Sequence, residues 1–344
     1  MESKPILSVK NLSTYFDMAE GTVKAVQDVS FDLHRNEVLG IVGETGSGKS
    51  VTVKSIAGLI DSPGRIAKGE INLLTEEFSK NKVEEYVDLA KLQYEKFSRI
   101  RGKHIGMIFQ DPMTSLDPMY TIGNQMIETI VHHDKVSESE AKERSIKLLE
   151  LVGIPKPSER INDYPFQLSG GQRQRVVIAI ALSCNPEVLI SDEPTTALDV
   201  TVQAQILELM KDLQEEYKNG MIFITHDLAV IAEIASKVSI MYGSYQMEIA
   251  PVEKVYKEAR HPYTYALLSC IPRLDIKQAE LLPIPGQPPV MMDPPKLCPY
   301  LPRCRRSIDK CKKVLPDLIE IEKNHFVRCN NPVAKKYLVK EKTE

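Results

Sequence analysis

The sequence lacks any apolar run long enough to cross a membrane. The longest, Val176–Leu182, falls far short of the roughly 20 residues that a spanning helix needs. The N-terminus also lacks the apolar stretch of a signal peptide. These absences predict a soluble protein of the cytoplasm, which would serve a membrane only through partner chains.

An excess of one charge is missing as well. The chain has 44 Lys and Arg against 47 Asp and Glu, which gives a net charge of −3. This near-balance argues against binding nucleic acid along the whole chain, because such binding needs a basic field. A length of 344 residues with 42% hydrophobic residues predicts a globular chain of two modules.

Closely spaced cysteine pairs are also absent. Four of the six cysteines crowd near the C-terminus with the spacing C-x5-C-x6-C-x17-C; they are Cys298, Cys304, Cys311 and Cys329. In a reducing cytosol such a cluster favours a metal over disulfides. The missing C-x2–4-C pairs disfavour a structural zinc ion without excluding it. Four thiolates can also hold a [4Fe–4S] cluster, so iron–sulfur, zinc and no metal all stay open.

Strands and helices alternate along most of the chain, which predicts an α/β fold with a largely parallel sheet. Residues 61–100 interrupt this pattern and are interpreted as an insertion. Eight of the 22 prolines lie between Pro283 and Pro302. The C-terminal part is therefore predicted to be an extended appendage rich in proline and cysteine. The main predicted elements are the strands Val38–Val42, Val188–Ser191 and Met221–Thr225 and the helices Val51–Leu59, Gln172–Leu182 and Val202–Tyr217.

A phosphate-binding loop follows the strand Val38–Val42. It fits the pattern G-x-x-x-x-G-K-[ST], and its residues with the first one after it are Gly43, Glu44, Thr45, Gly46, Ser47, Gly48, Lys49, Ser50 and Val51. Its glycines let backbone N–H groups converge on phosphate oxygens, at the start of a helix. Lys49 can reach the β and γ phosphates, and the Ser50 hydroxyl can bind Mg²⁺.

Two adjacent carboxylates end the apolar strand Val188–Ser191, where α/β sheets place their ligands. Asp192 would hold Mg²⁺ through water, and Glu193 would polarise the water that attacks the γ-phosphate. Farther back along the chain, Leu168-Ser-Gly-Gly-Gln172 opens a helix. Ser169 alone would be a helix N-cap, whereas Ser169, Gly170 and Gly171 together would also present a second anion-binding helix terminus.

These motifs in this order, with Gln110, Ala197-Leu198-Asp199 and Ile224-Thr-His226-Asp227, resemble the nucleotide-binding subunit of ABC transporters over about residues 5–250. The resemblance implies a P-loop NTPase ABC cassette, with a RecA-like core and a helical subdomain at about 111–166. It also implies a head-to-tail dimer that encloses two ATP molecules. Each ATP would lie between one chain's phosphate loop and the partner's segment of Ser169, Gly170, Gly171 and Gln172.

The resemblance also assigns roles to single residues. Gln110 would touch Mg²⁺ and sense the membrane partner, His226 would contact the γ-phosphate and support Glu193, and Asp199 would tune the dimer interface. Taken alone, Gln110 is an ordinary strand-end glutamine, His226 a core or surface histidine and Asp199 a helix N-cap. Phe16 is the first choice for the aromatic that stacks on adenine, and Tyr15 is the second.

A narrower resemblance rests on Phe109-Gln-Asp-Pro-Met-Thr-Ser-Leu-Asp-Pro118, His261-Pro-Tyr-Thr-Tyr-Ala-Leu-Leu268 and Pro285-Gly-Gln-Pro-Pro289. These segments are similar to the ATPases of oligopeptide and dipeptide importers, where the matching cysteines are associated with a [4Fe–4S] cluster. Arg and Lys residues between 303 and 313 would then lower the pKa values of the cysteine thiols. Alternatively, they form a solvated face.

The sequence thus predicts an ATP-hydrolysing, Mg²⁺-dependent subunit of a peptide importer on the cytoplasmic face of the cell membrane. Residues 1–250 would form the cassette, and 251–344 the extension with the four-cysteine site. Its expected partners are a second, paralogous ATP-binding subunit, two membrane permease subunits and an extracellular or periplasmic solute-binding protein, with no nucleic acid. The alternatives are a soluble ABC-type ATPase acting on ribosomes or nucleic acid and, less favoured, a non-catalytic scaffold.

Overall fold

A computed structural model describes residues 4–79, 81, 83–196, 198–270, 284–294 and 296–334. The chain divides into two compact units, each made of separate stretches of sequence. The first comprises Met1–Ser8, Asp32–Glu37 and Asn72–Ile224 and is called the carboxylate unit, because it holds Asp192 and Glu193. The second comprises Val9–Phe31, Val38–Ile71 and Thr225–Glu344 and is called the phosphate-loop unit.

The centre of the carboxylate unit is a parallel set of strands, β6 (Ile105–Ile108), β7 (Val188–Asp192) and β8 (Gly220–Ile224). Every residue of β7 and β8 is buried, as expected for parallel strands that helices cover on both faces. Near the start of the unit, β5 (Glu85–Asp88) pairs antiparallel with the end of β4 (Gly64–Thr75).

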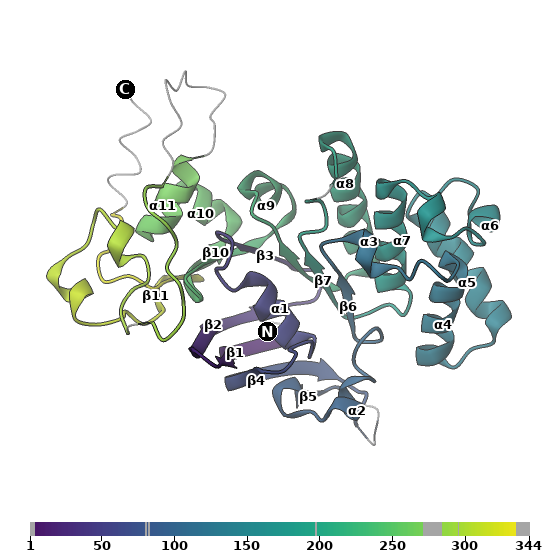
Figure 1. Ribbon diagram of the computed structural model, residues 1–344, viewed down its shortest axis with the longest axis horizontal. Helices are drawn as coiled ribbons and strands as arrows, with labels where there is room; N and C mark the ends of the chain where they lie inside the picture. The colour runs from purple at the N-terminus through teal and green to yellow at the C-terminus, as the bar shows by residue number, and fades with distance from the viewer. Residues whose placement is uncertain are drawn as a thin grey trace. The chain divides into compact units, whose positions relative to one another are not determined.

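Helices make up most of the rest of this unit. Figure 1 shows α4 (Ile122–Asp134), α5 (Glu138–Leu151) and α7 (Gly170–Leu182) side by side. Helix α5 begins where the Ser137 hydroxyl accepts a hydrogen bond from the Glu140 amide at 3.2 Å, an N-cap that the motif Ser137-Glu-Ser-Glu140 predicts from sequence alone. The other helices are α2 (Tyr94–Phe97), α3 (Pro112–Ser115), α6 (Pro157–Arg160), α8 (Val200–Tyr217) and the 3₁₀ turns Leu89–Lys91 and Pro165–Gln167.

In the phosphate-loop unit, β3 (Val38–Val42) runs parallel to β9 (Lys237–Tyr242), and β9 pairs antiparallel with β10 (Tyr245–Pro251). All five residues of β3 are buried, and the burial of this apolar strand holds in place the point where the phosphate loop begins. The helices of the unit are α1 (Lys49–Ile56), α9 (Leu228–Ile234), α10 (Val252–Glu258) and α11 (Pro262–Ser269). Strands β1 (Leu7–Met18), β2 (Gly21–Leu33) and β4 contain residues of both units.

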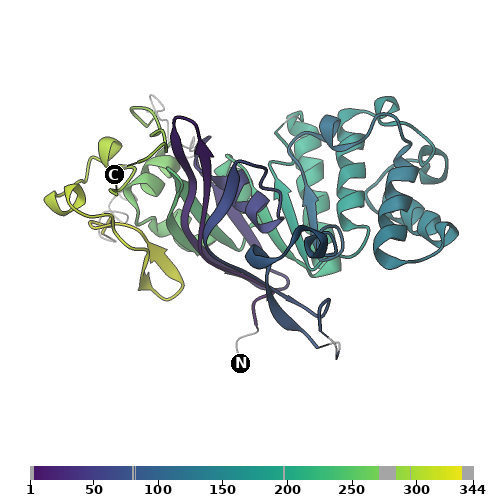
Figure 2. The ribbon, with the colours of Figure 1, turned by 60° about the horizontal axis from the view of Figure 1, so that its bottom comes forward.

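The C-terminal segment, yellow in Figure 2, consists mostly of loops. It contains the 3₁₀ turns Leu301–Arg303 and Asp309–Lys312 and the hairpin of β11 (Ile319–Glu322) and β12 (His325–Val327). Strand β12 pairs with β10, and a buried arginine behind it, Arg328, donates to the carboxylate of Asp28 at 2.7 Å. The last described residues are thus tied to one of the first strands.

Most predicted elements are present. Strand β3 has the predicted bounds, and β7, β8, α7 and α8 differ from prediction by one or two residues. Residues 61–100, interpreted as an insertion, contain the twelve-residue strand β4, whose last three residues are all buried, and the sequence analysis did not predict this strand. No helix within the described residues is long and apolar enough to cross a membrane. Ala197 of the Ala197-Leu198-Asp199 motif lies outside the described residues.

Candidate functional site

The phosphate loop connects β3 to α1 and depends on two close backbone approaches. A Cβ atom on Gly43 would lie 2.1 Å from the Met241 carbonyl oxygen, and one on Gly48 would lie 2.3 Å from that of Ala25. Gly48 also has φ +100°, a conformation that glycine adopts readily. No other residue fits either position, so the glycines of the motif are required by the fold of the loop itself.

The side chains of Lys49 and Ser47 place polar groups inside this loop. The Lys49 side chain is buried, and its Nζ donates to the Gly43 carbonyl oxygen at 2.9 Å and to that of Glu44 at 3.2 Å. The buried Ser47 hydroxyl has no hydrogen-bond partner within the described part of the chain. Thr45 and Gly46, at the tip of the loop, are exposed. The structure thus concentrates a cation, a hydroxyl and backbone amides at the start of α1, which suits a phosphate ligand.

The predicted carboxylate site lies at the carboxyl ends of parallel strands in the other unit. Asp192 is the buried last residue of β7, and Glu193 follows it with a strained φ of +48°. Gln110, just after β6, donates from Nε2 to Glu193 Oε2 at 3.2 Å. The Thr196 hydroxyl donates to the same oxygen at 3.0 Å. The structure therefore brings the predicted site residues Gln110 and Glu193 into contact, and it adds Thr196, which the sequence analysis missed.

Ser169 and Asp199 are both helix N-caps. The Ser169 hydroxyl accepts from the Gln172 amide at 3.3 Å while the Gln172 side chain accepts from the Ser169 amide at 3.0 Å. Asp199 Oδ1 accepts from the Val202 amide at 3.0 Å. Ser169, Gly170 and Asp199 are exposed. Their alternative interpretation as caps is confirmed, and their roles toward a partner chain stay predictions.

Both adenine-stacking candidates lie on β1, and as neighbours on a strand they point to opposite sides. The Phe16 ring edge approaches Gly64, where a Cβ would lie 2.6 Å away. Tyr15 lies near the cations of Lys24 and Arg65, 6.0 and 5.9 Å from its ring centre. His226 is exposed. Phe16, Lys49, Ser50 and His226 belong to the phosphate-loop unit, whereas Gln110, Asp192 and Glu193 belong to the carboxylate unit.

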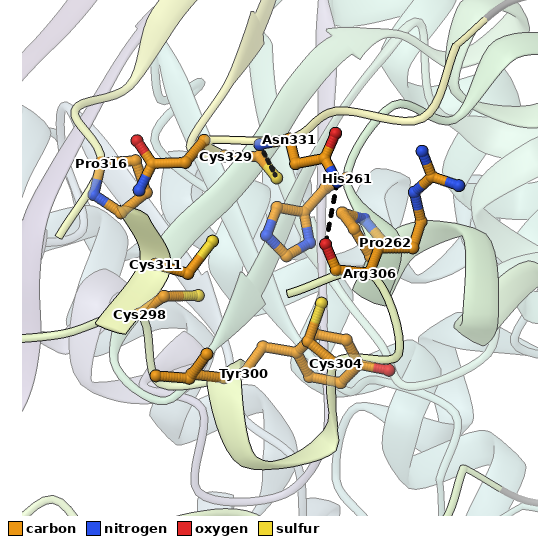
Figure 3. A pocket seen from close by; sticks show the side chains of 12 residues that line it. His261, Pro262, Cys298, Tyr300, Cys304, Arg306, Cys311, Pro316, Cys329 and Asn331 are labelled. Atoms are coloured by element: carbon orange, nitrogen blue, oxygen red, sulfur yellow. Dashed lines mark hydrogen bonds between the residues drawn. The ribbon is translucent and has the colours of Figure 1, made fainter. Parts of the chain in front are cut away.

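The four C-terminal cysteines line one small cavity of about 20 Å³, and Figure 3 shows their sulfur atoms turned toward a common space. All four are free thiols. Burial raises the pKa of Cys298 to about 11 and that of Cys329 to about 12, and it also raises the pKa of Cys304. The charge of Arg306 lowers the pKa of Cys304, as the sequence analysis expected of the basic residues, but burial outweighs it and the net shift is upward.

No group of three or more His, Cys, Asp and Glu side chains that could hold a metal ion is found in the described stretches of the chain. The cavity is lined in addition by His261, Pro262, Tyr300 and Arg306. Among the remaining cysteines, Cys184 is buried as predicted, and Cys270 is half-buried.

Comparison with known proteins identifies the family. Residues 26–196 match the family described as ABC transporter, and residues 247–311 match the one described as oligopeptide/dipeptide transporter, C-terminal region. The chain is 46% identical to the dipeptide transport ATP-binding protein DppD of Bacillus subtilis, over 94% of each chain. It is also 46% identical to the oligopeptide transport ATP-binding protein OppD of the same organism, over 94% of this chain and 88% of OppD.

The chain belongs to the ATP-binding subunits of ABC transporters. As a member of this family it is an ATPase, and ATP and Mg²⁺ are its expected ligands. The comparisons support the transporter hypothesis and not the alternative of an ATPase acting on ribosomes or nucleic acid.

Solved structures agree on the fold. The post-hydrolysis dimer of the ATP-binding cassette MJ0796, bound to ADP and phosphate, matches with a TM-score of 0.61 and 27% identity, over 72% of this chain and 98% of that one. The ABC subunit cbiO1 of Clostridium perfringens matches with a TM-score of 0.59 and 26% identity, over 74% of this chain and 92% of that one. The predicted ABC cassette fold is confirmed.

Proposed function

We propose that this ATPase powers the import of dipeptides, oligopeptides or related solutes as part of an ABC transporter complex. The observation that carries the proposal is the match of residues 247–311 to the C-terminal region of oligopeptide/dipeptide transporters. It is joined by the 46% identity to DppD and OppD over nearly the whole chain, since both proteins are named for peptide transport.

In this proposal the phosphate loop binds the triphosphate. Lys49 contacts the β and γ phosphates, and Ser50, Gln110 and Asp192 hold Mg²⁺. Glu193 polarises the attacking water. Its contacts with Gln110 and Thr196 support this role, because they fix the direction of its carboxylate. His226 would contact the γ-phosphate, and Phe16 would stack on adenine.

The complex would contain a second ATP-binding subunit, which we infer to be a paralogue arranged head to tail. Each ATP would then be completed by the partner's Ser169, Gly170 and Gly171. The exposure of Ser169 and Gly170 at the start of α7 supports this arrangement, because it leaves the helix terminus accessible to a ligand on another chain. Two membrane permease subunits would dock near Gln110 and the helical subdomain of residues 111–166, on the cytoplasmic face of the membrane. A solute-binding protein would deliver the substrate.

We further propose that residues 251–344 form a functional extension in which four cysteines hold a [4Fe–4S] cluster. Four free thiols around one cavity, Cys311 buried and the other three half-buried, form a suitable donor set. The spacing of the four cysteines lacks the C-x2–4-C pairs common in structural zinc sites, and this supports a cluster over a single zinc ion. The cluster would supply a structural crosslink between distant parts of the loop-rich segment.

Two measurements test these proposals. Anaerobically purified protein should absorb near 400 nm and contain iron, and protein that holds zinc or no metal would refute the cluster. Affinity-tagged protein should co-purify with integral membrane subunits, and its ATPase activity in reconstituted vesicles should rise when peptide and binding protein are added. Co-purification with ribosomes instead would overturn the transport function.

A further inference from the structure

Residue Glu44 of the phosphate loop is held by two residues of the C-terminal region. Its backbone N–H donates to the Tyr263 hydroxyl at 3.2 Å. Its carboxylate accepts from Arg303 Nη1 at 3.0 Å through one oxygen and 2.9 Å through the other. Because the Glu44 carbonyl also accepts from Lys49, any movement of Glu44 moves the lysine of the loop.

Arg303 is itself held in place by its other bonds. Its Nε donates to the Pro285 carbonyl at 2.8 Å, its Nη2 to the Ile284 carbonyl at 3.0 Å and its Nη1 also to the Tyr242 hydroxyl at 3.0 Å. The arginine side chain is 6% exposed and that of Glu44 is 24% exposed, so solvent screens the pair little. A rigid guanidinium with several donors can serve all these acceptors at once, and a lysine ammonium cannot.

The same arginine lies beside the cysteine-lined cavity, since Cys304 is the next residue. Tyr242, Tyr263 and Tyr300 pack against one another with ring centres 4.5 to 5.3 Å apart. Tyr300 also lines the cavity, and Figure 3 shows it close to Cys304. The packed rings of Tyr242, Tyr263 and Tyr300 therefore connect the phosphate loop to the cysteine cavity. Arg303 binds the loop, and its neighbour Cys304 lines the cavity.

We propose that Arg303 is a positioning residue for ATP binding, which holds and neutralises Glu44 and so couples the phosphate loop to the folded cysteine segment. The proposal rests on the ATP site proposed above. Two physical effects follow from the contacts. Arg303 fixes the backbone of the loop through Glu44, and its charge offsets a carboxylate that would otherwise repel the triphosphate at close range.

The first test measures ATP binding and turnover in the complete transporter. Arg303→Met removes the guanidinium group and keeps an unbranched side chain. We expect the Kd and KM for ATP to rise by about tenfold with a much smaller change in kcat. Arg303→Lys should fall between Arg303→Met and the wild type. The matched control is Arg305→Met, an exposed arginine two residues on, which should bind ATP as the wild type does.

A second substitution separates this role from a merely structural one. If an unpaired Glu44 carboxylate weakens ATP binding, then adding Glu44→Gln to Arg303→Met should restore several-fold of the lost affinity. If Arg303 has only a structural role, the double variant should bind ATP no better than Arg303→Met, because it loses a further hydrogen-bond acceptor.

Coupling must also act in the reverse direction, from ATP to the cysteine segment. Hydrogen exchange followed by mass spectrometry should show slower exchange of residues 296–313 on addition of MgATP, in the wild type and in Arg305→Met. Arg303→Met should lose this slowing at saturating ATP. If Arg303→Met unfolds the cysteine segment, the experiment uses Glu44→Gln instead, because that substitution leaves the sequence of the segment intact. In Glu44→Gln, too, MgATP should no longer slow the exchange of residues 296–313.

The outcomes distinguish this proposal from the function on which it rests. Wild-type ATP affinity in Arg303→Met overturns the positioning role, and so does undiminished slowing of exchange in Glu44→Gln. Both results leave the ATP site in place as long as Lys49→Ala fails to bind ATP. ATP binding by Lys49→Ala at wild-type strength would instead remove the proposed site itself.

Discussion

The phosphate loop and the Ser169–Gln172 segment both place glycines at the start of a helix, but they are held very differently. The loop has a buried lysine, two glycines pressed against carbonyl groups and a glutamate bound by Arg303 and Tyr263. In the second segment Ser169 and Gly170 are exposed, and the hydrogen bonds that hold them come from the capping box of Ser169 and Gln172.

This difference shows how far one chain determines each site. The phosphate loop is shaped within its own unit, so its anion-binding geometry exists before any ligand arrives. The serine segment satisfies only its own helix terminus and leaves an accessible end. We therefore expect substitutions in the loop to act on ATP binding, and substitutions in the serine segment to act only on steps that need two chains.

The largest effect is expected at Lys49. Lys49→Ala should abolish ATP binding and turnover, because no other buried cation of the loop can replace it. Isothermal titration with ATP and a phosphate-release assay measure both. Lys54→Ala is the matched control, since Lys54 is exposed on the same helix, and it should behave as the wild type. Unchanged activity in Lys49→Ala would contradict the function of the loop.

The next largest effect is expected at Glu193. Glu193→Gln keeps the shape of the side chain but removes the base, so turnover should fall by about 10²- to 10⁴-fold while ATP binding persists. Size-exclusion chromatography should then show ATP-bound dimers that accumulate. Glu215→Gln, on the exposed side of α8, is the control. Near-normal hydrolysis by Glu193→Gln would remove this assignment.

A smaller effect on ATP turnover is expected at Ser169, and Ser137 provides a matched control. Ser137 caps α5 as Ser169 caps α7, and both hydroxyls accept the amide three residues on. Either Ser→Ala variant should lose about 1 kcal/mol of stability in urea unfolding. Only Ser169→Ala should also lower ATP turnover in the assembled transporter. Equal turnover in the two variants would leave Ser169 as a helix cap and nothing more.

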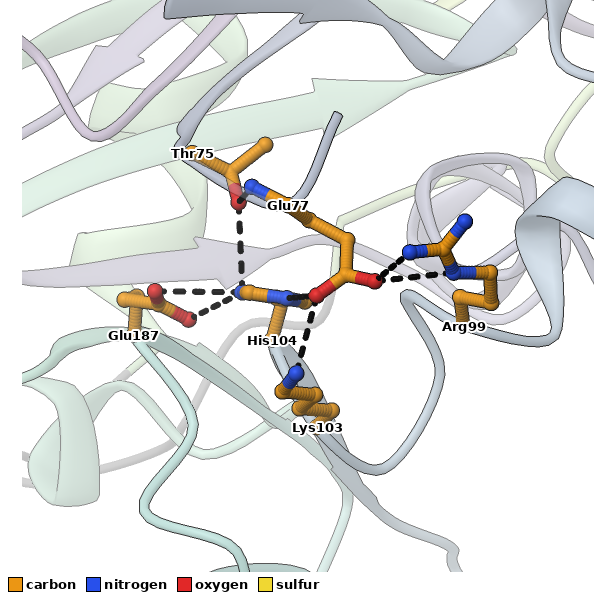
Figure 4. A network of polar contacts seen from close by, with 6 residues as sticks. All are labelled: Thr75, Glu77, Arg99, Lys103, His104 and Glu187. Carbon is orange, nitrogen blue, oxygen red and sulfur yellow. Dashed lines mark hydrogen bonds and ion pairs between the residues drawn. The ribbon is translucent and has the colours of Figure 1, made fainter. Parts of the chain in front are cut away.

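The carboxylate unit also contains an ion network around the buried side chain of His104 and the nearly buried side chain of Glu77, and neither residue has a role in the proposed ATP site. Figure 4 shows Glu77 between Arg99, Lys103 and His104, with Glu187 on the other side of the histidine ring. Burial alone would raise the pKa of Glu77, but its three cationic neighbours lower it to about 2. Burial alone would lower the pKa of His104, but Glu187 and Glu77 raise it.

The smallest expected effect is the pH dependence of this network. Glu77 has a lowered pKa in the folded state, so it stabilises the fold above pH 4.5 and loses that contribution as the pH falls toward 2. Urea unfolding at pH 6 and pH 3 should therefore show an acid loss about 1–2 kcal/mol larger in the wild type than in Glu77→Gln. His104 acts in the opposite direction, and its contribution is lost as the pH rises through its raised pKa. Equal acid losses would contradict the assignment to Glu77.

Local physics explains which elements the sequence predicted. The run Val38–Val42 is apolar throughout because every residue of β3 is buried, and the Ser137 cap is visible from four residues. Strand β4 was missed because Pro63 precedes it, Gly64 begins it and charges follow it, and these features resemble a loop. The pairing with neighbouring strands, which the local sequence does not show, is what makes this segment a strand.

The site was predicted only as far as contiguous motifs extend. Gln110 and Glu193 were each predicted from their own motif, and the structure shows that they are in contact. Arg303 was treated as one of several basic residues near the cysteines, although it binds a glutamate 259 positions away. The local sequence does not distinguish Arg303 from its neighbours, because Arg305 and Arg306 have the same side chain. Only the folded chain shows which arginine faces the loop.

The bond between Arg328 and Asp28 has a consequence for the order of synthesis. Asp28 is translated 300 residues before Arg328. Until Arg328 has been added, the phosphate-loop unit lacks β12 and this ion pair, whereas the stretch Asn72–Ile224 of the carboxylate unit is already complete. A nascent chain that ends before β12 thus contains the whole phosphate-loop motif but lacks the contacts that complete the fold around it.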